Sequence, residues 1–289
     1  MRRMLRWPRG GAVCVLLIGA SCAGAQSWPQ WRGPQASGLA PEKKLPAEWG
    51  QDKNIAWKVA LPGKGWSQPI VWGNKIFVTT AVTENQVKPK AGNFNPLVTA
   101  DGPASGGARL PIGPGGVFGP RPPPPDKVYR WKLICLEGAT GKTLWEKTAR
   151  EGKPRATINQ NNTYASETPA TDGEHVIAYF GNTGLYGYDV SGNLVWSKDL
   201  GVYPMQFGWG KEHYSEHLEG TKGFTASPWA NDGKVFCLDE TGVTVVLKAG
   251  PKPEVLATNK LDEMFRTSVA VMNESLLLRG VDHLYCIGR

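Results

Sequence analysis

One spacing of side chains in the sequence could hold a metal ion. His213 and His217, with Glu216 beside the second, match the H-x-x-E-H pattern. On a helix the two imidazoles would share one face and bind zinc, with the glutamate as base. The stretch between Gly210 and Gly220 has no apolar stripe, and isolated helices this short are marginal in water. We therefore predict that these histidines do not hold zinc.

A glycine-containing stretch at 138–143 resembles a phosphate-binding loop only in part. It has the G-K-T order of that motif, but Leu136 stands where the motif requires another glycine. Leu144 and Trp145 follow it and begin a strand pattern rather than a helix. The sequence therefore predicts a tight turn between two strands.

A polar run at 159–164 offers a third kind of chemistry, which is hydrogen bonding to a ligand. The candidate ligand-binding side chains are Asn161, Asn162, Tyr164, Trp66 and Arg266. Each lies at or just before the predicted start of an innermost strand, so they are expected at the mouth of a central channel. Amides, hydroxyls and one arginine could bind a small polar ligand or a peptide there. The alternative is that they satisfy one another and channel water. We assign no catalytic residue.

A repeat positions these side chains. Four segments place the same seven-residue frame before an apolar triplet, and the triplets lie at 76–78, 176–178, 235–237 and 276–278. The pairs Gly-Asn, Asp-Gly, Asp-Gly and Asn-Glu precede the triplets, where positive φ or an Asx turn is needed. The same β-hairpin is therefore predicted four times.

A second hairpin follows the first one. Trp145 and Trp196 each come four residues after a turn glycine, and Trp57 ends a similar strand without that turn. Two hairpins in succession describe one blade of a β-propeller, whose two apolar faces are buried by stacking blades around an axis. We predict an all-β fold, a propeller with about four four-stranded blades. The blades are expected at 67–147, 164–200, 224–259 and 267–287.

The fourth blade shows only three strands, expected within 267–272, 275–279 and 283–287. Its outer edge would otherwise have unpaired backbone groups, which favour aggregation. Residues 54–61 carry the Trp of an outer strand but no other strands of their own blade. We predict that this N-terminal strand joins the fourth blade and closes the ring.

Two stretches interrupt the repeat. Residues 89–125 contain ten prolines and eight glycines and are predicted to form a long loop. Residues 201–223 are predicted to form an irregular junction. Three cysteines of the repeats, Cys135, Cys237 and Cys286, lie in separate apolar runs, which indicates small buried hydrophobes rather than disulfides or a zinc site.

The N-terminus has the features of an export signal. A basic segment with four arginines precedes a short apolar core, and a small-x-small site ends at Ala25. We predict a signal peptide at 1–25, one propeller domain at 26–289, and a periplasmic or secreted protein. A lipoprotein acylated at Cys22 is the alternative. Without the four arginines the net charge falls from +8 to +4, so the basicity is poor evidence for nucleic-acid binding.

Several motifs together resemble the PQQ-binding-like β-propeller repeat family. They are W-P-Q-W-R-G-P at 28–34, L-P-A-E-W at 45–49, T-G-K-x-x-W at 140–145, S-E-T-P at 166–169 and L-Y-C-I-G at 284–288. The resemblance implies an exported propeller, usually of seven or eight blades. Relatives of the family include quinoprotein alcohol dehydrogenases and the lipoprotein that assists outer-membrane-protein assembly. After 201–210 the chain departs from the pattern, because several central blades are missing.

The resemblance also implies the cofactor to be considered, which is PQQ with calcium. Quinone-dependent dehydrogenases of this kind need a base Asp, a calcium site and often two adjacent cysteines. The sequence has no adjacent cysteines and no oxygen-ligand cluster with a recognisable spacing. We therefore predict no resident cofactor.

Three functions compete on these observations. The favoured one is an exported, non-enzymatic propeller that recognises a protein, peptide or glycan. The alternatives are a quinone-dependent oxidoreductase and a scaffold for outer-membrane-protein assembly, whose exposed strand edges would pair with clients. In each case we expect a monomer that neither spans a membrane nor binds nucleic acid.

Overall fold

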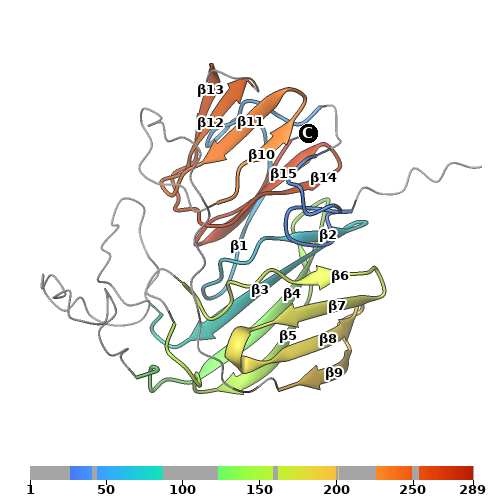
Figure 1. The fold of residues 1–289 in the computed structure, drawn as a ribbon, viewed down its shortest axis with the longest axis vertical. Coiled ribbons are helices and arrows are strands. Elements are labelled where there is room, and N and C mark those ends of the chain that lie inside the picture. The colour runs from blue at the N-terminus through green and yellow to red at the C-terminus, as the bar shows by residue number, and fades with distance from the viewer. Residues whose placement is uncertain are drawn as a thin grey trace, which may run out of the picture.

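The computed structural model describes residues 27–40, 44–86, 123–158, 162–199, 201, 226–248 and 254–288. Within these residues sixteen strands form four antiparallel four-stranded sheets, which follow one another in an arc (Figure 1). The predicted signal peptide with Cys22, the zinc-like histidines His213 and His217, Asn161, most of the Pro/Gly stretch and nearly all of the junction lie outside the described residues.

Each sheet is one blade. In blades 1 to 3 the strands run in chain order from the innermost strand to the outermost strand. Blade 1 consists of β2 (Ile70–Trp72), β3 (Lys75–Thr83), β4 (Tyr129–Glu137) and β5 (Thr143–Gly152). Blade 2 consists of β6 (Ala170–Thr171), β7 (His175–Tyr179), β8 (Leu185–Asp189) and β9 (Leu194–Lys198). Blade 3 consists of β10 (Trp229–Asn231), β11 (Lys234–Leu238), β12 (Val243–Lys248) and β13 (Val255–Lys260).

Blade 4 takes its strands from both ends of the described chain. It consists of β14 (Ala270–Met272), β15 (Ser275–Arg279), β16 (His283–Ile287) and β1 (Ile55–Ala60). β1 pairs antiparallel with β16, with Trp57 opposite Cys286 and Val59 opposite Leu284. The predicted N-terminal strand is therefore confirmed as the outer strand of the last blade. The predicted closure of the ring is not seen, because the four described blades form an open arc (Figure 1).

The repeated hairpin forms because its turn residues accept positive φ. In blade 3 Asp232 and Gly233 have φ of 46° and 68°, and in blade 4 Asn273 and Glu274 have φ of 45° and 63°. Such turns match the right-handed twist of the flanking strands. The phosphate-loop-like stretch is likewise a tight turn, which ends where β5 begins at Thr143. The only helical element of the described residues is a 3-10 turn at Gly181–Thr183. These residues contain no helix that is long and apolar enough to cross a bilayer.

Alternation along each strand gives every blade two apolar faces. We call the face that carries the middle residue of the repeated triplet the forward face, and the face with the first and third residues the rear face. The forward face of blade 1 (Phe77) shares a buried cluster with the rear face of blade 2 (Val176, Ala178). The rear face of blade 1 (Ile76, Val78) shares the other cluster with blades 3 and 4. Blade 1 is thus buried on both faces.

The N-terminal segment runs across the innermost strands of three blades. Trp28 exchanges backbone hydrogen bonds with Val71 of β2, at 2.9 Å each. Thr171 of β6 donates to the carbonyl of Pro29 at 2.9 Å, and Ala40 donates to Ala230 of β10 at 3.2 Å. The segment therefore ties blades 1, 2 and 3 together near the axis.

Gln68, at the entrance to β2, is buried and connects four parts of the chain. Its Oε1 accepts from the N–H of Arg32 at 3.0 Å, and its Nε2 donates to the carbonyl of Val269 beside blade 4. Its own N–H donates to Oγ1 of Thr168 beside blade 2 at 3.1 Å. Beside it Arg279 is completely buried and donates to the carbonyl of Ser67 at 3.1 Å, and burial lowers its pKa to about 9. Polar side chains therefore fill the axis between blades 4 and 1.

Candidate functional site

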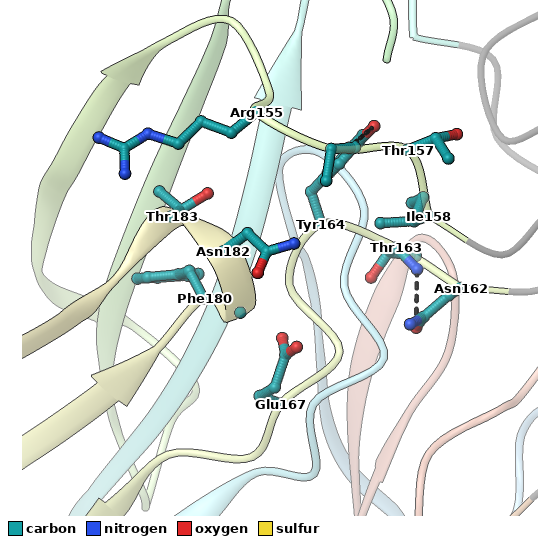
Figure 2. A pocket seen from close by; sticks show the side chains of 12 residues that line it. Arg155, Thr157, Ile158, Asn162, Thr163, Tyr164, Glu167, Phe180, Asn182 and Thr183 are labelled. Carbon is teal, nitrogen blue, oxygen red and sulfur yellow. Dashed lines mark hydrogen bonds between the residues drawn. The ribbon is translucent and has the colours of Figure 1, made fainter. Parts of the chain in front are cut away.

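A small cavity lies between blades 1 and 2, at the end of the blades where the polar run enters β6. Its walls come from residues 155–158 after β5, 162–167 before β6, and 180–183 between β7 and β8 (Figure 2). Its volume is about 30 Å³, which is room for one or two water-sized groups. A larger ligand could place only one small group inside and would have to lie on the surface around it.

Two of the residues predicted as ligand-binding line this cavity. The ring of Tyr164 makes an edge contact with Tyr129, with ring centres 5.0 Å apart, and its hydroxyl donates to the carbonyl of Ala156 at 3.1 Å. Asn162 caps the following turn, because its Oδ1 accepts from the N–H of Thr163 at 3.0 Å. Both side chains therefore shape the wall, and the hydroxyl of Tyr164 already has an acceptor.

Glu167 is the charged group that the sequence interpretation missed. It belongs to the S-E-T-P motif, and its carboxylate points into the space framed by Asn182 and Tyr164 (Figure 2). Among the described residues no Lys, Arg or His forms an ion pair with it; the nearby backbone N–H groups of Ser166 and Glu167 are its donors. Desolvation raises the pKa of the carboxyl, and these two hydrogen bonds offset only part of that rise.

The one arginine of the cavity wall does not neutralise this charge. Arg155 directs its guanidinium away from Glu167 (Figure 2) and pairs with Asp199 at 2.6 Å. The 3-10 turn approaches from the other side, where a Cβ at Gly181 would lie 3.0 Å from Oε1 of Glu167. The cavity therefore presents one negative charge beside amide and hydroxyl groups, which suits a small group carrying a single positive charge.

The raised pKa of Glu167 predicts a dependence of stability on pH. Because the folded pKa lies above the ordinary value of 4.5, the folded state holds this proton more tightly than the unfolded state does. The contribution to stability is complete below the unfolded pKa and is lost as pH rises through the folded pKa. Urea denaturation from pH 4 to pH 8 should show Glu167→Gln losing less stability over this interval than the parent chain. Parallel profiles for the two chains would contradict the prediction.

The other two predicted residues form a separate group. Arg266 lies over the ring of Trp66, with its guanidinium carbon 5.8 Å from the ring centre. Its Nη2 also donates to Oε2 of Glu240 at 3.1 Å, and both of these side chains are largely buried. Glu240 follows β11 in blade 3, so Arg266 joins blade 3 to the entrance of blade 4. The described residues thus place Asn162 and Tyr164 at the cavity, and Trp66 and Arg266 outside its lining.

The cysteines and metal ligands add little to this site. Cys135 and Cys286 are buried and free, and burial raises the pKa of the first thiol to about 12 and of the second to about 11. Cys237 is only half-buried, which differs from the expectation of a core residue, because it lies on the open rear face of blade 3. Within the described ranges no three or more His, Cys, Asp or Glu side chains gather as they would around a metal.

Residues 127–242 match a family model described as outer membrane protein assembly factor BamB. No curated protein matches the sequence.

Among solved structures, the chain is similar to BamB from Moraxella catarrhalis, with 14% identity over 79% of this chain and 86% of that one and a TM-score of 0.22. It is also similar to the computationally designed Ika8 protein, with 9% identity over 55% of this chain and 43% of that one and a TM-score of 0.19. A third similar structure is the computationally designed Ika4 protein, with 10% identity over 56% of this chain and 85% of that one and a TM-score of 0.19. The strand pairing of the chain itself defines its fold as four propeller blades. Residues 127–242, from the start of β4 to the turn after β11, carry the sequence pattern of the BamB family, and the resemblance expected from the sequence is confirmed there.

Proposed function

We propose that the protein is an exported, non-enzymatic propeller that recognises a protein or peptide, and that the cavity beside Glu167 receives a cationic side chain of this ligand. The observation that carries the proposal is the desolvated Glu167 carboxylate, which faces a small cavity and has no basic partner among the described residues. A lysine ammonium is small enough to enter this cavity, and it supplies a single positive charge to pair with the carboxylate of Glu167. Of the three ligand classes considered from the sequence, a neutral glycan supplies neither.

The arrangement around the cavity supports binding rather than catalysis. The wall is held by turns that satisfy themselves, since Oγ of Ser166 lies 3.0 Å from the N–H of Thr163 and donates to its carbonyl at 3.2 Å. Oγ1 of Thr79 donates to the carbonyl of Glu167 at 3.4 Å and anchors this loop to blade 1. A carboxylate held on a fixed loop can bind a cation with little loss of conformational entropy.

A lysine tripeptide with blocked ends tests this proposal. We expect saturation-transfer NMR to detect binding of acetyl-Gly-Lys-Gly-amide but not of the same peptide with norleucine, which lacks the charge. Glu167→Gln should weaken binding at least about tenfold, or about 1.4 kcal/mol. Glu174→Gln, which removes an exposed carboxylate from the turn before β7, is the matched control and should bind as the parent does. Equal binding by the Glu167→Gln variant would rule out this cavity as the recognition site.

A scaffold in outer-membrane-protein assembly is the second candidate, and the family match over residues 127–242 favours it. The two candidates are compatible, because a scaffold must also recognise a protein. Every residue of strand β9 is exposed and the strand is the outer edge of blade 2, so it could pair with a strand of a client. A proline at position 196 of β9 would block such pairing and leave the cavity intact, which separates the two modes of recognition.

A further inference from the structure

At two places in the arc, a tryptophan of one blade packs against the following blade. Trp57 of blade 4 donates its indole N–H to the carbonyl of Gly138 in blade 1 at 2.9 Å. Its ring packs on Gly141, whose Cβ would lie 2.6 Å from Cε3. Trp145 of blade 1 makes the same contact with blade 2, where it donates to the carbonyl of Val190 at 3.3 Å and packs on Gly192. The forward faces of blades 4 and 1 therefore each carry a tryptophan that docks on the following blade.

The third docking tryptophan is not covered by another blade. Trp196 occupies the equivalent position in blade 2, is 40% exposed and lies over Gly187 of its own sheet. On the same forward face Ile177 is 38% exposed, whereas the equivalent residues of the other blades are completely buried. Those equivalents are Phe77, Phe236 and Leu277. Among the described residues, therefore, no blade packs against the forward face of blade 2.

The opposite end of the arc presents the complementary face. Val235 and Cys237 are the rear-face residues of the blade 3 triplet, and both are only half-buried. The equivalent residues of the other three blades are at most 1% exposed. They are Ile76, Val78, Val176, Ala178, Leu276 and Leu278. Blade 3 therefore has a rear face of the kind that blades 1, 2 and 4 bury against a neighbour.

We propose that the forward face of blade 2 docks on the rear face of blade 3 in a second copy of this chain. We choose a second copy as the partner because the chain itself carries both halves of the recurring interface, one on blade 2 and the other on blade 3. The arc holds these two end blades apart, so they do not meet within one chain (Figure 1). Gly242, in the turn of blade 3, faces the backbone of Leu261 and Glu263, so Trp196 is expected to contact the sheet rather than this turn.

Two copies would close a ring of eight blades. A contact between two different faces repeats until rotation closes the assembly, and otherwise continues as a filament. Propellers typically have four to eight blades, so two four-bladed chains fit this range and three do not. The inference is independent of the cavity beside Glu167, and a failure of either would leave the other standing.

The test is sedimentation velocity with the whole protein over a wide range of concentrations. We expect a dimer that dissociates on dilution. Ile177→Glu on blade 2 and Val235→Glu on blade 3 should each weaken dimerisation at least about tenfold, which corresponds to 1.4 kcal/mol. Leu144→Glu, at an exposed position of blade 1 outside both end faces, is the matched control and should dimerise as the parent does. Far-ultraviolet circular dichroism and a thermal melt establish that each variant is folded.

Mixing the two variants separates this arrangement from other ones. A chain with Ile177→Glu keeps its rear face, and a chain with Val235→Glu keeps its forward face, so the mixture should recover one intact interface and associate. If blade 2 met blade 2 of the other copy, Val235→Glu alone would dimerise as the parent does, and mixing would not rescue the chain with Ile177→Glu. A protein that stays monomeric at every concentration would overturn the proposal. This outcome would mean that another segment covers the Trp196 face or that the face stays open to solvent.

Discussion

A chain that begins at Gly63 is expected to lose cooperative folding. The truncation removes β1, so β16 loses its partner from Ile55 to Ala60, and the last blade is left with an open edge. It also removes Trp28 and Trp49, both of them buried core residues. Burial of one such side chain typically contributes about 3–5 kcal/mol, while a whole domain is stable by only about 5–15 kcal/mol.

The measurement is a thermal melt followed by size exclusion, with a chain that begins at Ser27 as the control. The control keeps every described residue and should melt as the parent does. Trp57→Ala is a milder form of the same test. Its ring is half-buried and its hydrogen bond to Gly138 is lost, so we expect a loss of about 2 kcal/mol. Equal melting of the Gly63 chain and the parent, with the same elution profile at the same concentration, would refute a structural role for the N-terminal segment.

Phe77→Ala is expected to destabilise the protein by about 3–5 kcal/mol. Phe77 is completely buried on the forward face of blade 1, where its ring meets Trp145 with ring centres 5.9 Å apart. Removing the ring leaves a cavity between two sheets that are held in place by their other contacts. A loss of this size is a large part of a typical domain stability.

Ile177→Ala is the matched comparison, because it changes the same position of the repeat in blade 2. Its side chain is partly exposed, so the expected loss is less than about 1 kcal/mol. Both variants should be measured by urea denaturation at low protein concentration, because self-association would add concentration-dependent stability. Equal losses at the two positions would show that the forward face of blade 2 is covered in the monomer.

The fold followed from the sequence because the repeat is local. Turn pairs such as Asn273-Glu274 and apolar triplets recur with fixed spacing, and the strands of blade 4 begin or end within three residues of their predicted limits. The pairing of β1 with β16 was also predictable, because an outer strand with Trp57 had no other sheet to join. The burial of each face was less predictable, since it depends on the neighbouring blade. Cys237 lies in an apolar run like Cys135, yet it is only half-buried.

The candidate site was less accessible to sequence reasoning. The polar run led to Asn162 and Tyr164, but Glu167 stood out only as part of a motif. Its desolvation depends on the turn at Gly181–Thr183, which no local pattern connects to it. Arg266 was expected at an open channel mouth. Its pairing with Glu240 was not predictable, because the two residues are 26 positions apart and belong to no common sequence pattern. An acid between two polar neighbours, in the S-E-T-P motif just before β6, is the sequence signal that could have identified Glu167.

The pairing of β1 with β16 also determines when the protein can finish folding. The two strands are separated by more than two hundred residues, and contacts of such long range slow folding because a large loop must close first. A ribosome adds about 5–20 residues per second, so β1 waits for its partner for at least about ten seconds after it is made. During that time its edge and the half-built fourth blade are open to other chains. The formation of β16, which follows all the other described strands in the chain, therefore ends this vulnerable period.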